Sequence, residues 1–227
     1  QYITISTPSN TTDFGDMSSA IAYSTGVSNN TRGVFCGGYR LAESSVTNSM
    51  EYITIASTGN STDFGDMTAK KSDLVGFASS TRGVLGGGWS GSAKVNVIDY
   101  VTIASPGNAT DFGDLTAKRF STAGCSSSTI GLFGGGYDTG EINIIDYVTI
   151  ASTGNAADFG DLSVARHSLS SCSNSVRGIW GGGWDGALNN VIDYITIATP
   201  GNATDFGDLL AAKYGPAGCS DCHGGLT

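Results

Sequence analysis

The chain has little positive charge. It contains 11 Lys and Arg residues against 20 Asp and Glu in 227 residues, a formal net charge of −9 at pH 7. No segment is rich in Lys or Arg, and binding to a phosphate backbone needs a basic surface, so we expect no nucleic-acid partner. No apolar run approaches the ~20 residues that a membrane-spanning helix requires. We therefore expect no membrane insertion.

Histidine and proline are also scarce. His167 and His223 are the only histidines, and only 4 prolines occur. The sequence shows no Ser-His-Asp arrangement and no isolated pair of carboxylates, so we predict no catalytic residues. Glycine is abundant at 34 residues, but it recurs at fixed intervals, which indicates many tight turns in a folded chain and not a low-complexity segment.

One sequence pattern occurs five times. Asp-Phe-Gly-Asp recurs around Phe14, Phe64, Phe112, Phe159 and Phe206, and Tyr-(Ile/Val)-Thr-Ile begins at residues 2, 52, 100, 147 and 194. Both series advance by 50, 48, 47 and 47 residues. A period in the forties is typical of propellers and solenoids, whose units bury their apolar faces on one another. We expect one domain over 1–227, with repeats at about 1–50, 51–98, 99–145, 146–192 and 193–227.

The third copy predicts the structure of one repeat. Residues 97–103 are rich in β-branched and aromatic residues and alternate, which indicates a strand, and Gly107-Asn108 suits a tight hairpin. The returning strand carries Asp-Phe-Gly-Asp at 111–114. Residues 121–125 and 131–137 read as two further strands, so each repeat supplies the four antiparallel strands of a propeller blade. We expect the five Phe rings to pack between blades as structural core, with the Asp residues capping backbone N–H groups or facing nearby basic residues.

Three further features recur. Glycine runs lie at 37–38, 86–88, 134–136 and 181–183. An acidic residue precedes tyrosine in Glu51-Tyr52, Asp99-Tyr100, Asp146-Tyr147 and Asp193-Tyr194. A basic residue precedes the first strand at Lys71, Arg119, Arg166 and Lys213, with Ile21 in its place in the first copy. Together these features resemble the kelch repeat, although Phe stands where kelch repeats usually have Trp. The resemblance implies a kelch-like β-propeller.

The amino-acid sequence of the repeat is also similar to that of tandem kelch-like repeats in structural proteins of aquatic tailed phages. The resemblance rests on Gly-Asn-Ala-Thr-Asp-Phe-Gly-Asp at 107–114 and on the final His-Gly-Gly-Leu at 223–226. It implies a location on a virion or outside the cell, in a surface, tail-fibre or decoration protein. The partners implied are other virion subunits, in a homo-oligomer, or a glycan on the host surface.

The two ends of the chain predict how the ring closes. Residues 1–6 and 12–17 correspond to the third and fourth strands of a blade, whereas 211–219 and 224–227 correspond to the first and second. Pairing of residues 1–6 with 224–227 would complete one shared blade. We therefore expect an all-β, five-bladed propeller closed by its N- and C-terminal strands, without a free sheet edge.

All variation in repeat length falls in one loop. From the aromatic residue after the glycines to the next tyrosine the distance is 13, 11, 10 and 10 residues, starting at Tyr39, Trp89, Tyr137 and Trp184. This loop between the second and third strands should share a rim with the connection between blades, and such loops usually bind partners. The candidate binding residues are Tyr39, Arg40, Glu43, Trp89, Tyr137 and Trp184. Packing of the aromatic rings over the neighbouring blade is the alternative.

Two motifs suggest cofactors. Cys219, Cys222 and His223 match the C-x-x-C-H attachment motif of c-type haem. However, Cys219 occupies the repeat position of Cys125 and Cys172, which indicates a small buried residue. A Cys219–Cys222 disulfide, a zinc site and a shared calcium site at the Asp-Phe-Gly-Asp motifs stay as alternatives. We predict no cofactor and no metal.

These observations favour a non-enzymatic structural or binding module that mediates assembly or attachment. One alternative is a subunit of an extracellular filament or surface layer, in which propellers stack through their faces. A second alternative is a kelch-type copper oxidase, which would need His and Tyr ligands clustered at the axis. The two histidines occupy unrelated repeat positions, which argues against the oxidase.

Overall fold

The computed structural model describes residues 1–4, 6 and 9–219, and this part of the chain is all-β. Blade 1 contains β2 (Thr25–Ser28), β3 (Arg32–Cys36), β6 (Ser49–Thr54) and β7 (Thr62–Asp66). Blade 2 contains β8 (Val75–Ala78), β9 (Arg82–Gly86), β10 (Val97–Thr102) and β11 (Thr110–Asp114). Blade 3 contains β12 (Ala123–Ser126), β13 (Ile130–Gly134), β14 (Ile144–Thr149) and β15 (Ala157–Asp161). Blade 4 contains β16 (Ser170–Ser173), β17 (Arg177–Gly181), β18 (Val191–Thr196) and β19 (Thr204–Asp208).

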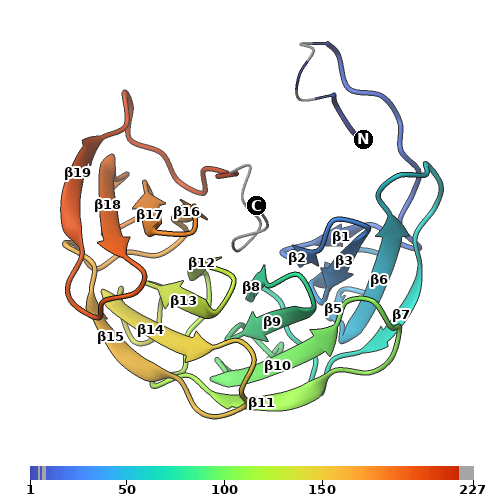
Figure 1. Cartoon of the computed structure of the whole chain (residues 1–227), viewed down its shortest axis with the longest axis horizontal. Coiled ribbons are helices and arrows are strands. Elements are labelled where there is room, and N and C mark those ends of the chain that lie inside the picture. Colours follow the sequence, from blue (N-terminus) through green and yellow to red (C-terminus); the bar gives the residue numbers. More distant parts are fainter. Residues whose placement is uncertain (5, 7–8, 220–227) are drawn as a thin grey trace.

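The four sheets are antiparallel and stand side by side in an arc, each with its first strand at the centre and its fourth strand outside (Figure 1). A small sheet of β1 (Ile21–Ala22), β4 (Tyr39–Arg40) and β5 (Ser45–Val46) adjoins blade 1. The described residues contain no helix with the length and apolar character needed to cross a membrane.

A chain of backbone hydrogen bonds around the axis reveals five blade positions. In blades 2 to 4 the residue two positions before the first strand donates its N–H to the equivalent carbonyl of the preceding blade, and Gly215 N donates to Ser168 O in the same way, all over 2.9–3.0 Å. The residues joined in this way are Tyr23, Asp73, Ser121, Ser168 and Gly215. Because Gly215 follows blade 4, the chain of bonds already extends to the fifth position. The fold is a five-bladed β-propeller.

A second link joins the outside of each blade to the next. Gly154 N donates to Phe112 O at 2.7 Å, and Asp114 N donates to Asn155 Oδ1 at 3.0 Å. Gly113 lies so close to blade 3 that a Cβ there would be 2.5 Å from the Gly154 carbonyl, and its φ of +142° also excludes other residues. The Gly-Asn turn expected from the sequence therefore serves as a contact between blades.

The N-terminal hairpin is the outer part of the fifth blade. Tyr2 and Thr12 pair as Tyr100 and Thr110 do, and Gly59 N donates to Phe14 O at 2.7 Å, so the hairpin is joined to blade 1 by the usual link. It lies at the blade 1 end of the open side of the arc (Figure 1). The expected pairing of residues 1–6 with 224–227 lies outside the described residues.

The join between blade 4 and the fifth position differs from the others. Between described residues, neither the outer link to Phe206 nor a bond from Tyr23 N to Gly215 O is formed. A Cβ on Gly207 would meet no atom of the described residues within 4 Å, in contrast to its equivalent Gly113. We call this join the seam.

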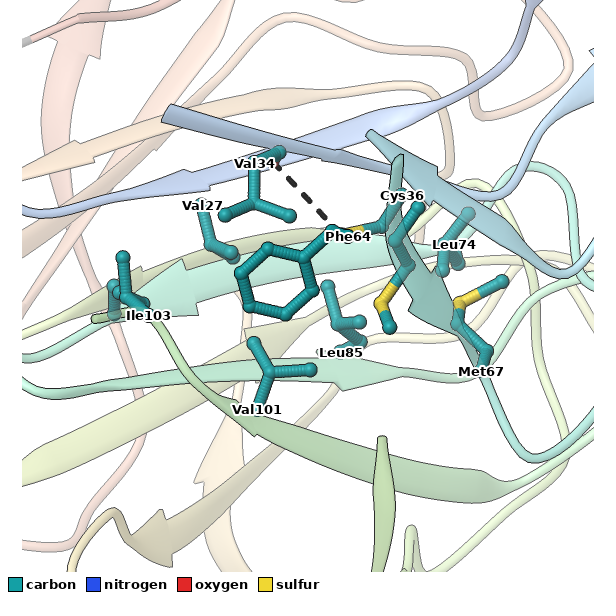
Figure 2. Packing of buried hydrophobic residues seen from close by; sticks show 11 residues of the cluster. Val27, Val34, Cys36, Phe64, Met67, Leu74, Leu85, Val101 and Ile103 are labelled. Atoms are coloured by element: carbon teal, nitrogen blue, oxygen red, sulfur yellow. Dashed lines mark hydrogen bonds between the residues drawn. The ribbon is translucent and has the colours of Figure 1, made fainter. Parts of the chain in front are cut away.

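The Phe rings form the core between blades, as predicted, at three of the five positions. Phe64 is 2% exposed and packs in a cluster with Val101 and Ile103 of blade 2 (Figure 2). Phe112 and Phe159 are equally buried in the corresponding clusters. The expectation of five buried rings is corrected at the two ends: Phe14 is half-buried, and Phe206 is 54% exposed because it faces the seam.

The inner strands are shorter than the sequence indicated. β12 begins at Ala123 and not at residue 121, because Ser121 has a φ of +53° and belongs to the axial hydrogen-bond chain. β13 ends at Gly134, because Gly135 and Gly136 have φ values of +63° and +118°. A left-handed backbone cannot continue a ladder, so the glycine runs end the strand and do not form part of it.

Candidate functional site

The loops of variable length lie on one rim, which we call the variable rim. In blade 2, Trp89 pairs both with Ser72, in the connection from blade 1, and with Lys94, across its own loop. In blade 1 the same arrangement is extended into the sheet of β1, β4 and β5. The prediction that the variable loops share a rim with the connections between blades is therefore confirmed. The longest loop, 40–50, is an ordered part of this rim.

The structure brings two of the predicted binding residues together. Tyr39 and Trp89, from adjacent blades, line a hollow of about 420 Å³ together with the loop residues 44–46 and 90–92. Leu41 and Glu43 on the tip of the longest loop are exposed. At this part of the rim the variable loops differ most in length.

The other two aromatic candidates do not line this hollow, but Trp89 connects them to it. Tyr137 and Trp184 belong to an arc of rings that pack edge to face, with neighbouring centroids 5.4–6.3 Å apart; its members in order are Trp89, Phe120, Tyr137, His167, Tyr214 and Trp184. Most of these rings are half-buried. Sequence reasoning missed Phe120, His167 and Tyr214, although each directly follows the basic residue of its repeat.

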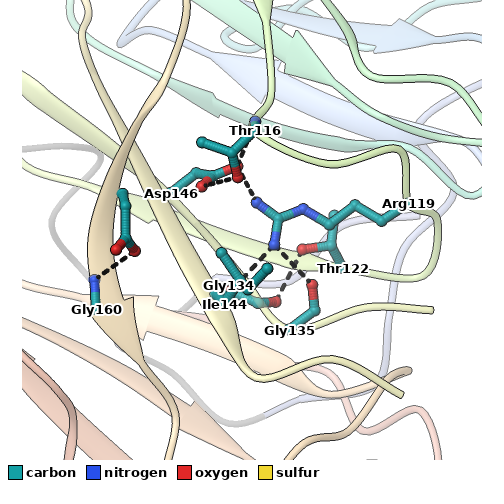
Figure 3. Close-up of polar contacts among 9 residues, drawn as sticks. Thr116, Arg119, Thr122, Gly134, Gly135, Ile144, Asp146 and Gly160 are labelled. Atoms are coloured by element: carbon teal, nitrogen blue, oxygen red, sulfur yellow. Dashed lines mark hydrogen bonds and ion pairs between the residues drawn. The ribbon is translucent and has the colours of Figure 1, made fainter. Parts of the chain in front are cut away.

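Buried ion pairs explain three of the four basic residues that precede the first strands, whereas the fourth, Lys213, is exposed. Asp146 and Arg119 are fully buried and form an ion pair, while Thr116 donates to the same carboxylate and Arg119 Nη1 donates to Ile144 O at 2.9 Å (Figure 3). A bulge between Ile145 and Asp146 shifts the register at this point, which turns the carboxylate inward. Equivalent pairs are Lys71–Asp99 at 2.8 Å and Arg166–Asp193 at 3.0 Å.

These pairs correct one expectation. The carboxylates that face the basic residues are those that precede tyrosine, not those of Asp-Phe-Gly-Asp. Asp158 and Asp205 of the latter motif accept hydrogen bonds from Gly160 N at 3.1 Å and Gly207 N at 2.8 Å, so the alternative role, capping of backbone N–H groups, is confirmed there.

Blade 1 has a different charge arrangement. Ile21 replaces the basic residue, and the carboxylate belongs to Glu51, which accepts hydrogen bonds from Ser18 and Ser61. Burial raises the pKa of Glu51, but these hydrogen bonds and the charge of Arg40 outweigh it and hold the pKa below its ordinary value. Arg40 also pairs with Glu43 at 2.8 Å and donates to Ser49 Oγ at 3.0 Å. Arg40 thus ties the longest loop to the blade.

The described residues contain no group of three His, Cys, Asp or Glu side chains that could hold a metal ion. Cys222 and His223 lie outside the described residues, so the haem, zinc and disulfide alternatives at Cys222 stay open. His167 is half-buried, and its Nδ1 lies 2.9 Å from Ser168 Oγ.

The cysteines give a simple test of the structure. Burial raises the pKa of the Cys36 and Cys125 thiols, whereas Cys219 is exposed. Because the thiolate is the reactive form, we expect a thiol reagent to modify Cys219 in the native protein and Cys36 and Cys125 only after unfolding. Mass-spectrometric mapping of the modified residues measures this. Rapid native labelling of Cys125 would contradict the packing of β12.

The fold and this rim define the class of the protein: a five-bladed β-propeller whose blades differ chiefly in the loops of one face. No protein-family model matches the sequence, and no curated protein matches it.

Proposed function

We propose that this propeller is a non-enzymatic structural and binding module of a kelch-like type. Its place is on a virion surface, as a tail-fibre or decoration protein, where it mediates assembly with other subunits or attachment to a host-surface glycan. The virion and the kelch relationship rest on the resemblance of the repeats. The general role as a binding module rests on the geometry of the variable rim.

One observation carries the proposal: the variable loops differ most from one another where loop 40–50 meets blade 2. A symmetric scaffold offers the same surface several times, whereas the hollow lined by Tyr39 and Trp89 is made by the longest loop and its neighbour. The recurring carboxylates support this interpretation, because Asp99, Asp146 and Asp193 are engaged in buried ion pairs and are not free for chemistry.

Shortening the longest loop tests the proposal. Deleting residues 41–43 gives this loop the length found in blade 4 and keeps Arg40, whose charge stabilises Glu51. We expect the shortened protein to lose assembly into particles or adsorption to host cells, with an unfolding temperature close to that of the wild type. Electron microscopy and an adsorption assay measure the first, and calorimetry the second.

A matched pair of substitutions provides the control. Leu41 in blade 1 is 57% exposed and Leu188 in the corresponding loop of blade 4 is 53% exposed. Leu41→Ser should weaken assembly or adsorption, whereas Leu188→Ser should not. If the shortened protein assembles and adsorbs normally, the rim formed by the Gly-Asn and Ser/Thr turns becomes the binding face. A bare filament instead of a particle would favour the surface-layer alternative.

A further inference from the structure

The axis of the propeller opens on the variable rim into a hollow of about 380 Å³ that is separate from the one between Tyr39 and Trp89. Its wall includes Tyr23, Asp73, Ser121, Ser168 and Tyr214. Four of these residues belong to the axial hydrogen-bond chain, which fixes their backbone positions relative to one another. The hollow therefore has a rigid rim contributed by successive blades.

The backbone at this ring is strained. Tyr23, Asp73, Ser121 and Ser168 have φ values of +57°, +51°, +53° and +51°, in the left-handed region that favours glycine. At another repeat position with positive φ, all four described copies have glycine: Gly37, Gly87, Gly135 and Gly182. Gly215, with a φ of +57°, shows that glycine also fits at the axis. Side chains are thus kept at the axis against a conformational cost, which points to a role for them.

The residue types at these equivalent positions do not follow the symmetry of the repeats. Tyrosine, aspartate, serine, serine and glycine follow one another around the axis. A ring of this kind has a single acidic side and can bind one ligand in one orientation. It lies on the same rim as loop 40–50, but it shares none of that loop's residues.

Asp73 carries a negative charge that no basic side chain in the described structure neutralises by an ion pair, and no Lys or Arg lines the hollow. Partial burial raises the pKa of Asp73, and its hydrogen bond from Ser72 Oγ, at 3.3 Å, is long. A protonated amine at this carboxylate would form a charge-assisted hydrogen bond, and an anion would be repelled. The exposed rings of Tyr23 and Tyr214 offer further contacts for a cation or for the apolar face of a sugar.

The rest of the wall is rich in hydroxyl groups. Ser121 follows Asp73 around the ring and Ser168 follows Ser121, and Thr122 and Ser24 also line the hollow. The volume is at the lower end of the range for small-molecule sites, which suits one monosaccharide unit. We propose that the axial hollow is a binding site for an amino sugar with a free amine, held through its ammonium group by Asp73 and through its hydroxyls by the serines.

Isothermal titration calorimetry of the full chain with glucosamine tests this assignment. We expect saturable binding of glucosamine and at least tenfold weaker binding of N-acetylglucosamine and of glucose, which lack the positive charge. Asp73→Asn keeps the size and the tolerance for positive φ but should weaken glucosamine binding at least tenfold. Asp63→Asn makes the same change in net charge on the exposed outer strand and should leave binding unchanged.

Each possible result of the titrations either supports or overturns the proposed site. Absence of saturable glucosamine binding, equal binding of glucose, or an unaltered Asp73→Asn variant overturns the site. Equal binding of lysine amide overturns the sugar part of the assignment, because it would show recognition of the amine alone. The proposed function of the loop is tested independently, since deletion of residues 41–43 should abolish assembly or adsorption and leave glucosamine binding intact.

Discussion

Replacing Asp146 with alanine should lower the free energy of unfolding by about 3–5 kcal/mol, because it leaves a buried guanidinium without its counter-ion. Asp146 and Arg119 are both fully buried, and the remaining acceptors of Arg119, the carbonyls of Gly135 and Ile144, are neutral. Chemical denaturation of the purified variant measures the loss.

A surface pair that joins blades 2 and 3 is the control. Lys94 and Asp138 form an ion pair of 3.0 Å with side chains 26% and 38% exposed, so Asp138→Ala should cost no more than about 1 kcal/mol. Replacing both members of the buried pair, as Arg119→Met with Asp146→Leu, should restore most of the loss, since the charge is removed together with its partner. A cost of Asp146→Ala similar to that of Asp138→Ala would contradict the buried ion pair.

Phe112→Ala should be equally severe, at about 3–5 kcal/mol, since a large ring is removed from a packed site. Phe112 is 2% exposed and packs in a cluster with Val148 and Ile150 of blade 3. The expected effect therefore includes loss of contact between two blades, and thermal unfolding should show a lower midpoint with one transition.

Phe206 provides the matched control, because it has the same sequence context and lies at the seam. With 54% of its surface exposed, Phe206→Ala should cost much less than Phe112→Ala. The residue that would cover it by analogy with Val148 is Ile3, which is itself 54% exposed. An equal loss for Phe206→Ala, reproduced by Ile3→Ala, would show that the N-terminal hairpin closes against blade 4 in solution. If Phe112→Ala itself has little effect, the Phe rings are not the core between blades.

The architecture was predictable from the sequence because the same local pattern is repeated. The period of 47–50 residues, the strand pattern of 97–103 and the glycine runs each specify local structure, and stacking of equal units follows from the need to bury their apolar faces. The variable rim was predictable for the same reason, because length differences between copies are visible directly. The grouping of Tyr39 with Trp89 follows from the order of the blades.

The partners of the charged residues were not predictable in the same way. Asp146 and Asp111 both lie near a basic residue in the repeat, but only the bulge before Asp146 turns a carboxylate toward Arg119. A one-residue change in strand register reverses the direction of a side chain, and the sequence contains no signal for the bulge itself.

The sequence alone determined the repeated blade, its strands and the position of its variable loop. Only the tertiary structure decided which copies are equivalent in environment: Phe112 and Phe206 share the same motif, yet one is buried and the other faces the seam. It also decided that Tyr23, Asp73, Ser121 and Ser168 meet at the axis, in left-handed backbone conformations that favour glycine. The physical reason is that burial and strain depend on the neighbouring blade, and a blade's neighbour is set by the closure of the ring and not by its own residues.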